Sequence, residues 1–292
     1  MKITIITGSR ADYGLLEFPI KTIQGDSFFE AKVLKIWGVD FFHSQEPTFD
    51  KAFRFCTDSF KDEKPELILV LGDRYEILAA AAAAHLLRIP IAHIGGGDVT
   101  EGSYDDAMRD SISRMATVHF VTSTSAMARL SHMGYRNVHL VGNPGIDYIR
   151  HVSWKGVRPF LNPYVVISYQ PETIDGINDI HDVIGSLKQD MIQVFIYPNS
   201  DLGSNEIRKA IKDHIASNPR RIAYDFLPHN QFLNLLVHCE EFVGNSSAML
   251  YEAPELGIKT KMIGKRQKGR TIPLGDGNAS ARIVNILKHI AI

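Results

Sequence analysis

The chain has 292 residues, of which 45% are hydrophobic and 22% charged, a composition typical of globular proteins with a packed core. A formal net charge of −1 gives no overall attraction to nucleic acid, and no apolar run is long enough to cross a bilayer. Two cysteines, Cys56 and Cys239, provide neither a disulfide framework nor a metal-ligand spacing, which favours a reducing, cytoplasmic setting.

Apolar runs alternate with helical patterns along the first half of the chain, which predicts a parallel sheet with helices between its strands. The chain enters directly as a strand and lacks the layout of a signal peptide. Residues 67–71 form a near-continuous apolar run, typical of a strand buried on both faces. The expected strands of this half are 2–7, 32–37, 67–71, 89–94, 118–122 and 138–141.

Charged residues gather where these strands end. Arg10 follows the first strand, Asp73 and Arg74 follow the strand at 67–71, and Asp98 and Asp106 follow the strand at 89–94. Ligands of open α/β sheets bind beyond the carboxyl ends of strands, so these positions favour a functional site. The dipole of a helix start explains some of the acids, but not their presence at two separate strand ends.

The second half repeats the pattern after a junction near 145–162, where Pro, Gly and Asn are frequent and the periodicity lapses. We therefore expect two α/β domains, 1–150 and 151–292, with a cleft between them. The expected strands of the second domain are 164–169, 192–197, 221–225, 241–243 and 260–263.

The stretch 244–253 predicts a strand, a tight turn and a helix start, an arrangement that binds anions through free backbone N–H groups. Ser246 and Ser247 are placed to bond phosphate oxygens, and Glu252 to accept from a pair of vicinal hydroxyls such as those of ribose. An ordinary serine N-cap explains this stretch equally well. Four cations in residues 264–270, among them Arg266 and Arg270, favour a nucleotide-diphosphate site instead.

Six blocks of sequence resemble a known family, the UDP-N-acetylglucosamine 2-epimerases, most closely the hydrolysing branch that feeds sialic and legionaminic acid synthesis. These blocks are residues 8–13, 72–74, 93–102, 142–145, 197–201 and 244–270. The resemblance covers nearly the whole chain in the right order. It implies a GT-B fold, in which two Rossmann-like parallel-sheet domains hold a UDP-sugar in the cleft between them.

The resemblance also implies roles for particular residues. Those that would hold the UDP part are Arg10, Gln170, Asn199, Ser246, Ser247, Glu252, Arg266 and Arg270. Those that match the reaction centre are Asp73, Asp98 and Asp106, together with Arg74. We expect neither a metal nor another cofactor, and we expect a homo-oligomer, either a dimer or a tetramer, as the resemblance implies.

Three positions depart from the family pattern. Asp98 stands where the family usually has glutamate, so its carboxylate is one methylene shorter. Gln170 stands before Pro171 where the family has histidine, and a glutamine cannot carry charge or transfer a proton. The histidine-bearing loop is compressed into residues 38–48, where His43 is a candidate replacement, although a loop histidine is more often incidental.

The family reaction removes the proton at C2 of the sugar while UDP leaves C1, after which water adds and releases the free 2-epimer. Neighbouring carboxylates raise one another's pKa, so that one donates a proton while another accepts. We therefore expect a hydrolysing UDP-sugar 2-epimerase. The alternatives are a GT-B glycosyltransferase that uses a UDP-sugar and a non-catalytic UDP-sugar binding protein.

Overall fold

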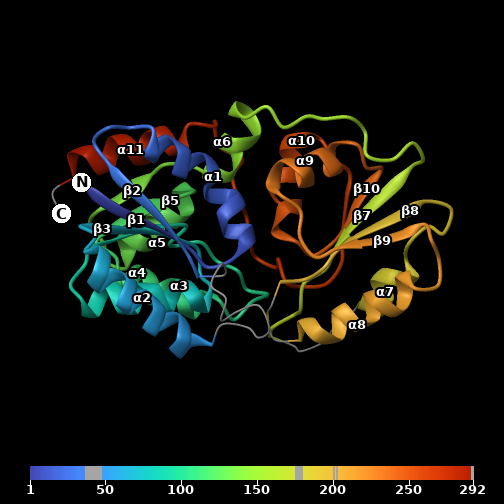
Figure 1. The fold of residues 1–292 in the computed structure, drawn as a ribbon, viewed down its shortest axis with the longest axis horizontal. Coiled ribbons are helices and arrows are strands. Elements are labelled where there is room, and N and C mark those ends of the chain that lie inside the picture. Colours follow the sequence, from blue (N-terminus) through green and yellow to red (C-terminus); the bar gives the residue numbers. More distant parts are fainter. Residues whose placement is uncertain (37–47, 175–179, 200, 202, 291–292) are drawn as a thin grey trace. The chain divides into compact units, whose positions relative to one another are not determined.

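A computed structural model describes residues 1–36, 48–174, 180–199, 201 and 203–290, although not the side chain of Arg10. The chain forms two compact units. Unit 1 consists of Met1–Val99, Asp105–His151 and Gly275–Ile292, and unit 2 of Thr100–Tyr104 and Val152–Leu274 (Figure 1).

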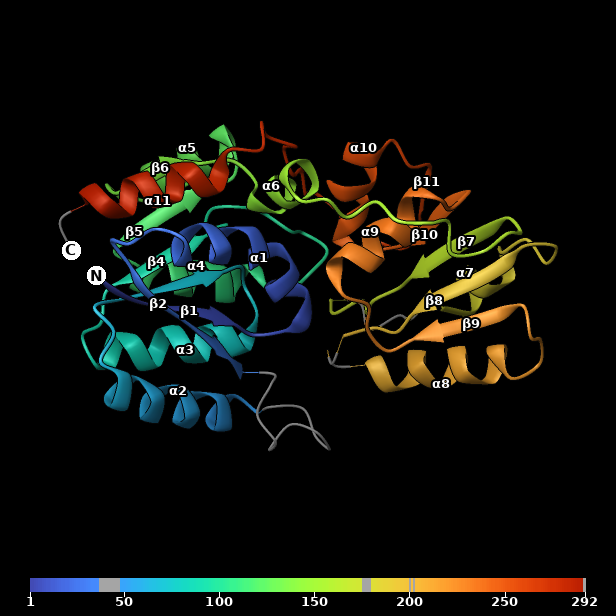
Figure 2. The same ribbon diagram turned by 45° about the horizontal axis from the view of Figure 1, so that its top comes forward.

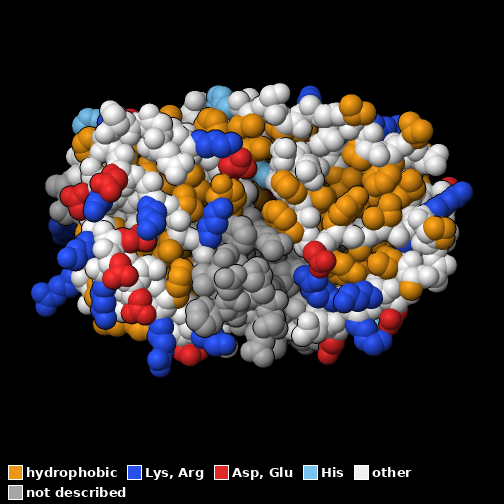
Figure 3. Space-filling model, viewed as in Figure 1, with side chains coloured by type: hydrophobic (Ala, Val, Ile, Leu, Met, Phe, Trp, Pro, Cys, Tyr) orange, Lys and Arg blue, Asp and Glu red, His pale blue; other side chains and the backbone are white. Residues whose placement is uncertain are grey.

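Unit 1 is built on a six-stranded parallel sheet in the order β2-β1-β3-β4-β5-β6. Its strands are β1 (Lys2–Thr7), β2 (Glu30–Lys35), β3 (Leu67–Leu71), β4 (Ile91–Ile94), β5 (Val118–Val121) and β6 (Val138–Leu140). Because β1, β3 and β4 are neighbours, the three strand ends singled out in the sequence lie along one edge of this sheet. On the face shown in Figure 3, the acidic and basic side chains of unit 1 are interspersed.

Helices cover both faces of this sheet (Figure 2). The helices α1 (Arg10–Gln24) and α11 (Ala279–His289) share one core with β1 and β3, and both contact α6 (Pro144–His151). The helices α2 (Phe49–Glu63), α3 (Tyr75–Leu86) and α4 (Asp106–Met115) pack on the other face. Five of the six alanines at 79–84 are fully buried, and their small side chains let α3 pack closely in the core on this face. The helix α5 (Thr124–His132) packs against β5 and β6.

Unit 2 is built on a five-stranded parallel sheet in the order β11-β10-β7-β8-β9. Its strands are β7 (Tyr164–Ser168), β8 (Ile192–Ile196), β9 (Arg221–Tyr224), β10 (Glu241–Gly244) and β11 (Thr260–Met262). The helices α7 (Ile180–Gly185) and α8 (Ser204–Ile215) cover one face. The helix α9 (His229–Val237), the 3-10 turn η3 (Ser247–Met249) and the helix α10 (Glu252–Leu256) cover the other.

The two parallel α/β units confirm the predicted fold class, but the expected boundaries of the domains need correction. The chain passes from unit 1 to unit 2 after His151, whereas Gly275–Ile292 belongs to unit 1 and not to the second domain. The physical reason is that Ile283, Val284 and Leu287 on α11 are buried in the core of the first sheet. Thr100–Tyr104 is likewise assigned to unit 2 by its contacts.

None of the described helices is both long and apolar enough to span a membrane.

Candidate active site

Two of the predicted reaction-centre residues lie just beyond the end of β3. Gly72 adopts a left-handed backbone with φ of +83°, which turns the chain between β3 and α3 and places the half-buried Asp73 and Arg74 at the edge of the sheet. The guanidinium of Arg74 donates from Nη2 to Oε1 of the buried Glu76 at 2.9 Å and from Nε to Oε2 at 3.2 Å. Arg74 is therefore held in place by a two-point ion pair.

The loop that follows β4 requires glycine. A side chain on Gly96 would place its Cβ 2.7 Å from Oγ of Ser113, and one on Gly97 would place it 2.6 Å from the carbonyl oxygen of Ala126. This close packing delivers Asp98 to the edge of the sheet, where Thr122 donates a hydrogen bond to its Oδ1 at 3.0 Å.

Arg109 links the predicted acids of unit 1. Its buried guanidinium donates from Nη2 to Oδ2 of Asp73, and from Nη1 to Oδ1 of Asp106 and to the carbonyl oxygen of Asp98. Burial opposes the charged form, but nearby carboxylates, with Asp73 first among them, outweigh burial and raise the pKa of Arg109. Arg109 thus pairs with the carboxylates of Asp73 and Asp106 and binds the backbone of Asp98, whose own carboxylate bonds to Thr122. The position of a residue after a strand does not single out Arg109, although its i,i+3 spacing from Asp106 is a usable signal.

His93 supports this cluster from inside the sheet. Its Nε2 donates to the carbonyl oxygen of Gly72 at 2.8 Å, and its Nδ1 therefore accepts from the hydroxyl of Ser113 at 3.0 Å. Burial lowers the pKa of His93 to about 4, so the ring is neutral at physiological pH. His93 holds the turn before Asp73 through this hydrogen bond, and its neutral ring is not placed to act as a general acid.

Asp12, in the first turn of α1, is a further titrating group near this edge. Burial raises its pKa to about 7, and the charges of Glu76 and Asp73 add to the rise while Arg74 opposes it. No described residue donates to its buried Oδ2.

In unit 2, Gln170 and Asn245 connect the ends of β7 and β10. The side chain of Asn245 accepts from the backbone N of Gln170 at 2.6 Å and donates to its carbonyl oxygen at 2.9 Å. The side chain of Gln170 in turn accepts from the backbone N of Asn199 at 2.9 Å. Gln170 is therefore oriented by its oxygen, which leaves its amide N–H groups as the part available to a ligand.

The predicted cationic segment forms a turn after β11. Arg266 donates from Nη1 to the carbonyl oxygen of Pro171 at 2.6 Å and from Nη2 to Oδ2 of Asp201 at 3.2 Å. In contrast, Nε of Arg270 is buried and meets no acceptor among the described residues. Much of the hydrogen-bonding capacity of Arg266 is thus already used within unit 2, whereas Arg270 retains a donor.

The segment after β10 corrects one expectation. It does not begin a helix at the serines: Ser246 caps η3 by accepting from the backbone N of Ala248 at 3.3 Å, and α10 starts only at Glu252. Glu252 is therefore the first residue of a short helix and does not lie inside a helix that begins at the serines. Its buried carboxylate accepts from Nε2 of His229 at 2.7 Å.

Two candidates are not placed by the structure. The side chain of Arg10 and the whole of His43 lie outside the described part of the chain. Within the described part, no group of three or more His, Cys, Asp or Glu side chains is arranged to hold a metal ion.

The two parallel α/β units, with charged residues at the ends of their strands, define a GT-B protein, and solved structures share this fold. One is the complex of S. aureus MnaA with UDP, with a TM-score of 0.80 at 18% identity over 99% of this chain and 96% of that one. Another is the UDP-GlcNAc 2-epimerase of Neisseria meningitidis bound to UDP-GlcNAc, with a TM-score of 0.78 at 19% identity over 99% and 100% of the two chains.

The family model described as UDP-N-acetylglucosamine 2-epimerase matches residues 43–272. A hydrolysing UDP-N,N'-diacetylbacillosamine 2-epimerase from Legionella pneumophila is 30% identical over 92% of this chain and 82% of that protein. A UDP-N-acetylglucosamine 2-epimerase from Neisseria meningitidis is 26% identical over 92% and 81% of the two proteins. The chain belongs to the UDP-N-acetylglucosamine 2-epimerase family.

Proposed function

We propose that this protein is a hydrolysing 2-epimerase that converts UDP-N-acetylglucosamine, or a related UDP-N-acetylhexosamine, into the free 2-epimer and UDP. The observation that carries the proposal is the cluster of Asp73, Asp98 and Asp106 around Arg109 in a member of this family. The hydrolysing relative from Legionella pneumophila supports the same type of reaction.

The acids of unit 1 are assigned to the sugar. One carboxylate takes the proton from C2, the C2–H electron pair forms a C1–C2 double bond, and the C1–O bond breaks with its electrons going to UDP. Water then adds its hydroxyl to C1, while C2 receives a proton on the face opposite to the one that lost it. Arg109 binds the carboxylates of Asp73 and Asp106 at the same guanidinium, which places two groups able to accept or donate a proton beside each other.

Unit 2 is assigned to the UDP part. The buried Nε of Arg270 lacks an acceptor in the described structure, which a diphosphate oxygen would supply. Ser246, Ser247 and Asn199 are proposed to contribute further bonds to UDP, and the amide of Gln170 a neutral donor. Arg266 is proposed to add positive charge near the leaving group. Arg10, at the start of α1, is also assigned to UDP.

The family match does not favour the glycosyltransferase or the non-catalytic binding protein. A free 2-epimer sugar is the type of product that sialic or legionaminic acid synthesis consumes. We also infer a cytoplasmic location and a homo-oligomer, either a dimer or a tetramer, from the family resemblance. Sedimentation velocity tests the oligomeric state.

The test is an NMR time course in deuterated water with UDP-N-acetylglucosamine and, separately, UDP-N,N'-diacetylbacillosamine. We expect one of them to give UDP and a free 2-epimer sugar carrying deuterium at C2. Asp73→Asn, Asp98→Asn and Asp106→Asn should each slow this conversion at least ~100-fold. The matched control is Asp110→Asn, since Asp110 lies on α4 but pairs with Arg129 at 2.9 Å. Release of UDP only when an acceptor is added would instead indicate a transferase.

A further inference from the structure

Glu252, the proposed ribose-binding residue, is held by a histidine that has no role in the proposal above. His229 is the first residue of α9 and Glu252 the first residue of α10, and both helices pack on the same face of the second sheet. Their side chains are 6% and 5% exposed, and Nε2 of His229 lies 2.7 Å from Oε1 of Glu252. Since an ionised carboxylate can only accept, Nε2 carries the proton and donates.

The two oxygens of Glu252 differ in their surroundings. Oε1 accepts from His229, whereas none of the described residues donates to Oε2. The second oxygen of this nearly buried carboxylate can therefore accept hydrogen bonds from a ligand that brings hydroxyl donors. The bond from His229 therefore holds Oε1 of Glu252 and directs Oε2 away from His229, where it can accept from a ligand.

The backbone gives Glu252 little support of its own. The helix α10 has only five residues, and its N-cap Tyr251 makes no side-chain capping bond. The preceding η3 is a single 3-10 turn. The side-chain bond to the longer helix α9 is consequently a main constraint on the direction of the carboxylate.

We propose that His229 is the positioning residue of the ribose subsite, which orients Glu252 so that its Oε2 accepts from the vicinal 2′- and 3′-hydroxyls of the nucleotide. This inference rests on the assignment of UDP to unit 2. It makes the pair His229 and Glu252 the element that selects ribonucleotides over nucleotides without these hydroxyls. The competing interpretation is that the pair only joins α9 to α10.

The two interpretations predict different effects of a His229 substitution on the binding of nucleotides with and without ribose hydroxyls. Calorimetric titration of the whole protein with UDP and with 2′,3′-dideoxy-UDP separates them, because only UDP offers the hydroxyls. The wild type should bind UDP at least about ten-fold more tightly than the dideoxy analogue, as expected for a hydrogen bond to a charged group. His229→Phe should weaken UDP binding about ten-fold and leave binding of the analogue within about two-fold.

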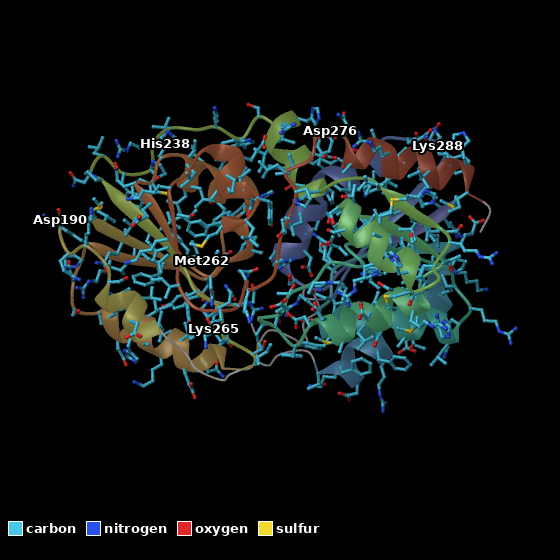
Figure 4. The ribbon with its side chains drawn as sticks, turned by 180° about the vertical axis from the view of Figure 1, so that it is seen from behind. Asp190, His238, Met262, Lys265, Asp276 and Lys288 are labelled. Carbon is cyan, nitrogen blue, oxygen red and sulfur yellow. The ribbon has the colours of Figure 1, made fainter. Side chains whose placement is uncertain are left out.

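Two variants keep the test decisive. His229→Gln retains an N–H donor near the position of Nε2 and should restore most of the preference for UDP. His238→Phe is the matched control, since His238 lies at the other end of α9, in the place labelled in Figure 4, and bonds through Nδ1 to the backbone carbonyl of Asn234 at 2.9 Å. It should bind both ligands like the wild type.

Three results would overturn this proposal and leave the proposed function standing. One is an unchanged preference for UDP in His229→Phe, and another is an equal loss of both ligands in His229→Phe and His229→Gln, which would indicate a structural link alone. The third is a wild type that binds UDP and the analogue equally. A wild type that binds neither ligand would overturn the proposed function as well, whereas binding of UDP without turnover bears on the reaction and not on His229.

Discussion

At the scale of single residues, Arg109 connects three segments of unit 1 through its side chain. Its side chain is 1% exposed and bonds to two carboxylates and a carbonyl group that come from three separate segments of the chain. Removing such a cation leaves the carboxylates to repel one another in a poorly solvated place.

We expect Arg109→Met to lower kcat by at least ~100-fold and the free energy of unfolding by about 3–5 kcal/mol, because the acids lose their common partner. Steady-state kinetics and urea unfolding measure the two effects. Arg109→Lys keeps the charge but not the forked geometry, so it should retain more stability than activity. Wild-type kcat in Arg109→Met would contradict the proposed cluster.

Asp12 predicts a specific pH dependence of stability. Because its pKa rises from 3.8 to about 7 on folding, the protonated form stabilises the native state below pH about 4, and this contribution is lost as the pH rises through about 7. Asp12→Asn cannot ionise, so it should exceed the wild type in stability at pH 8 by up to about 4 kcal/mol, and the difference should vanish toward pH 4.

Urea unfolding of both proteins across this pH range measures the difference. Asp26→Asn is the control, since the hydrogen bond from Lys288 lowers the pKa of Asp26. That variant loses an ion pair at 2.7 Å and should show no gain at pH 8. Parallel pH profiles for Asp12→Asn and the wild type would show that the carboxyl ionises as easily in the native state as in the unfolded chain.

The acids of the proposed reaction centre could be predicted because they follow apolar strands, and the strand order brings those strand ends together. The role of Arg109 as the common partner of Asp73 and Asp106 could not be predicted, because it depends on which residues of α4 face the end of β3. The bond between His229 and Glu252 was hidden for the same reason: the two residues are 23 positions apart, and only the packing of α9 beside α10 makes them neighbours.

At the scale of elements, all the expected strands form, with ends shifted by at most two residues, because buried parallel strands have a strong apolar signature. The expected helix after β10 is broken for a local reason. Pro254 has no N–H to donate to the carbonyl of Leu250, so a continuous helix from Ser247 is disfavoured and α10 begins with Pro254 in its first turn.

The start of α11 is held by Asp147, which lies on α6. Its buried carboxylate accepts from the backbone N of Ala279 at 3.2 Å and of Ser280 at 2.6 Å. Asp147→Ala leaves both N–H groups without this acceptor and should lower the free energy of unfolding by about 2–4 kcal/mol. Chemical unfolding measures this, with the exposed Asp276→Ala expected to change little. Equal midpoints for the two variants would argue against the cap.

At the scale of the whole molecule, the first unit depends on residues from the far end of the sequence. Ile283, Val284 and Leu287 are buried against the first sheet, at about 1.5–3 kcal/mol for each side chain. Periodicity shows that α11 has an apolar face to bury, but it carries no information on which sheet that face covers.

Truncation after Leu274 should therefore remove the cooperative unfolding of unit 1 and expose apolar surface that binds a hydrophobic dye. Circular dichroism during urea titration and dye fluorescence report on the two effects. A truncation after His289, which leaves α11 complete, is the control. An unchanged unfolding transition after the first truncation would place α11 outside the core of unit 1.

The position of α11 near residue 290 also affects the order in which the two units fold during translation. A ribosome completes the sheet and helices of unit 2 while the first sheet still lacks its last helix, although that sheet was translated earlier. Domains usually fold in the order of synthesis, but here the first-made unit finishes last. The apolar side of the first sheet that α11 will cover stays open throughout translation of Val152–Leu274, which makes the nascent chain a natural client for a chaperone that shields apolar surface.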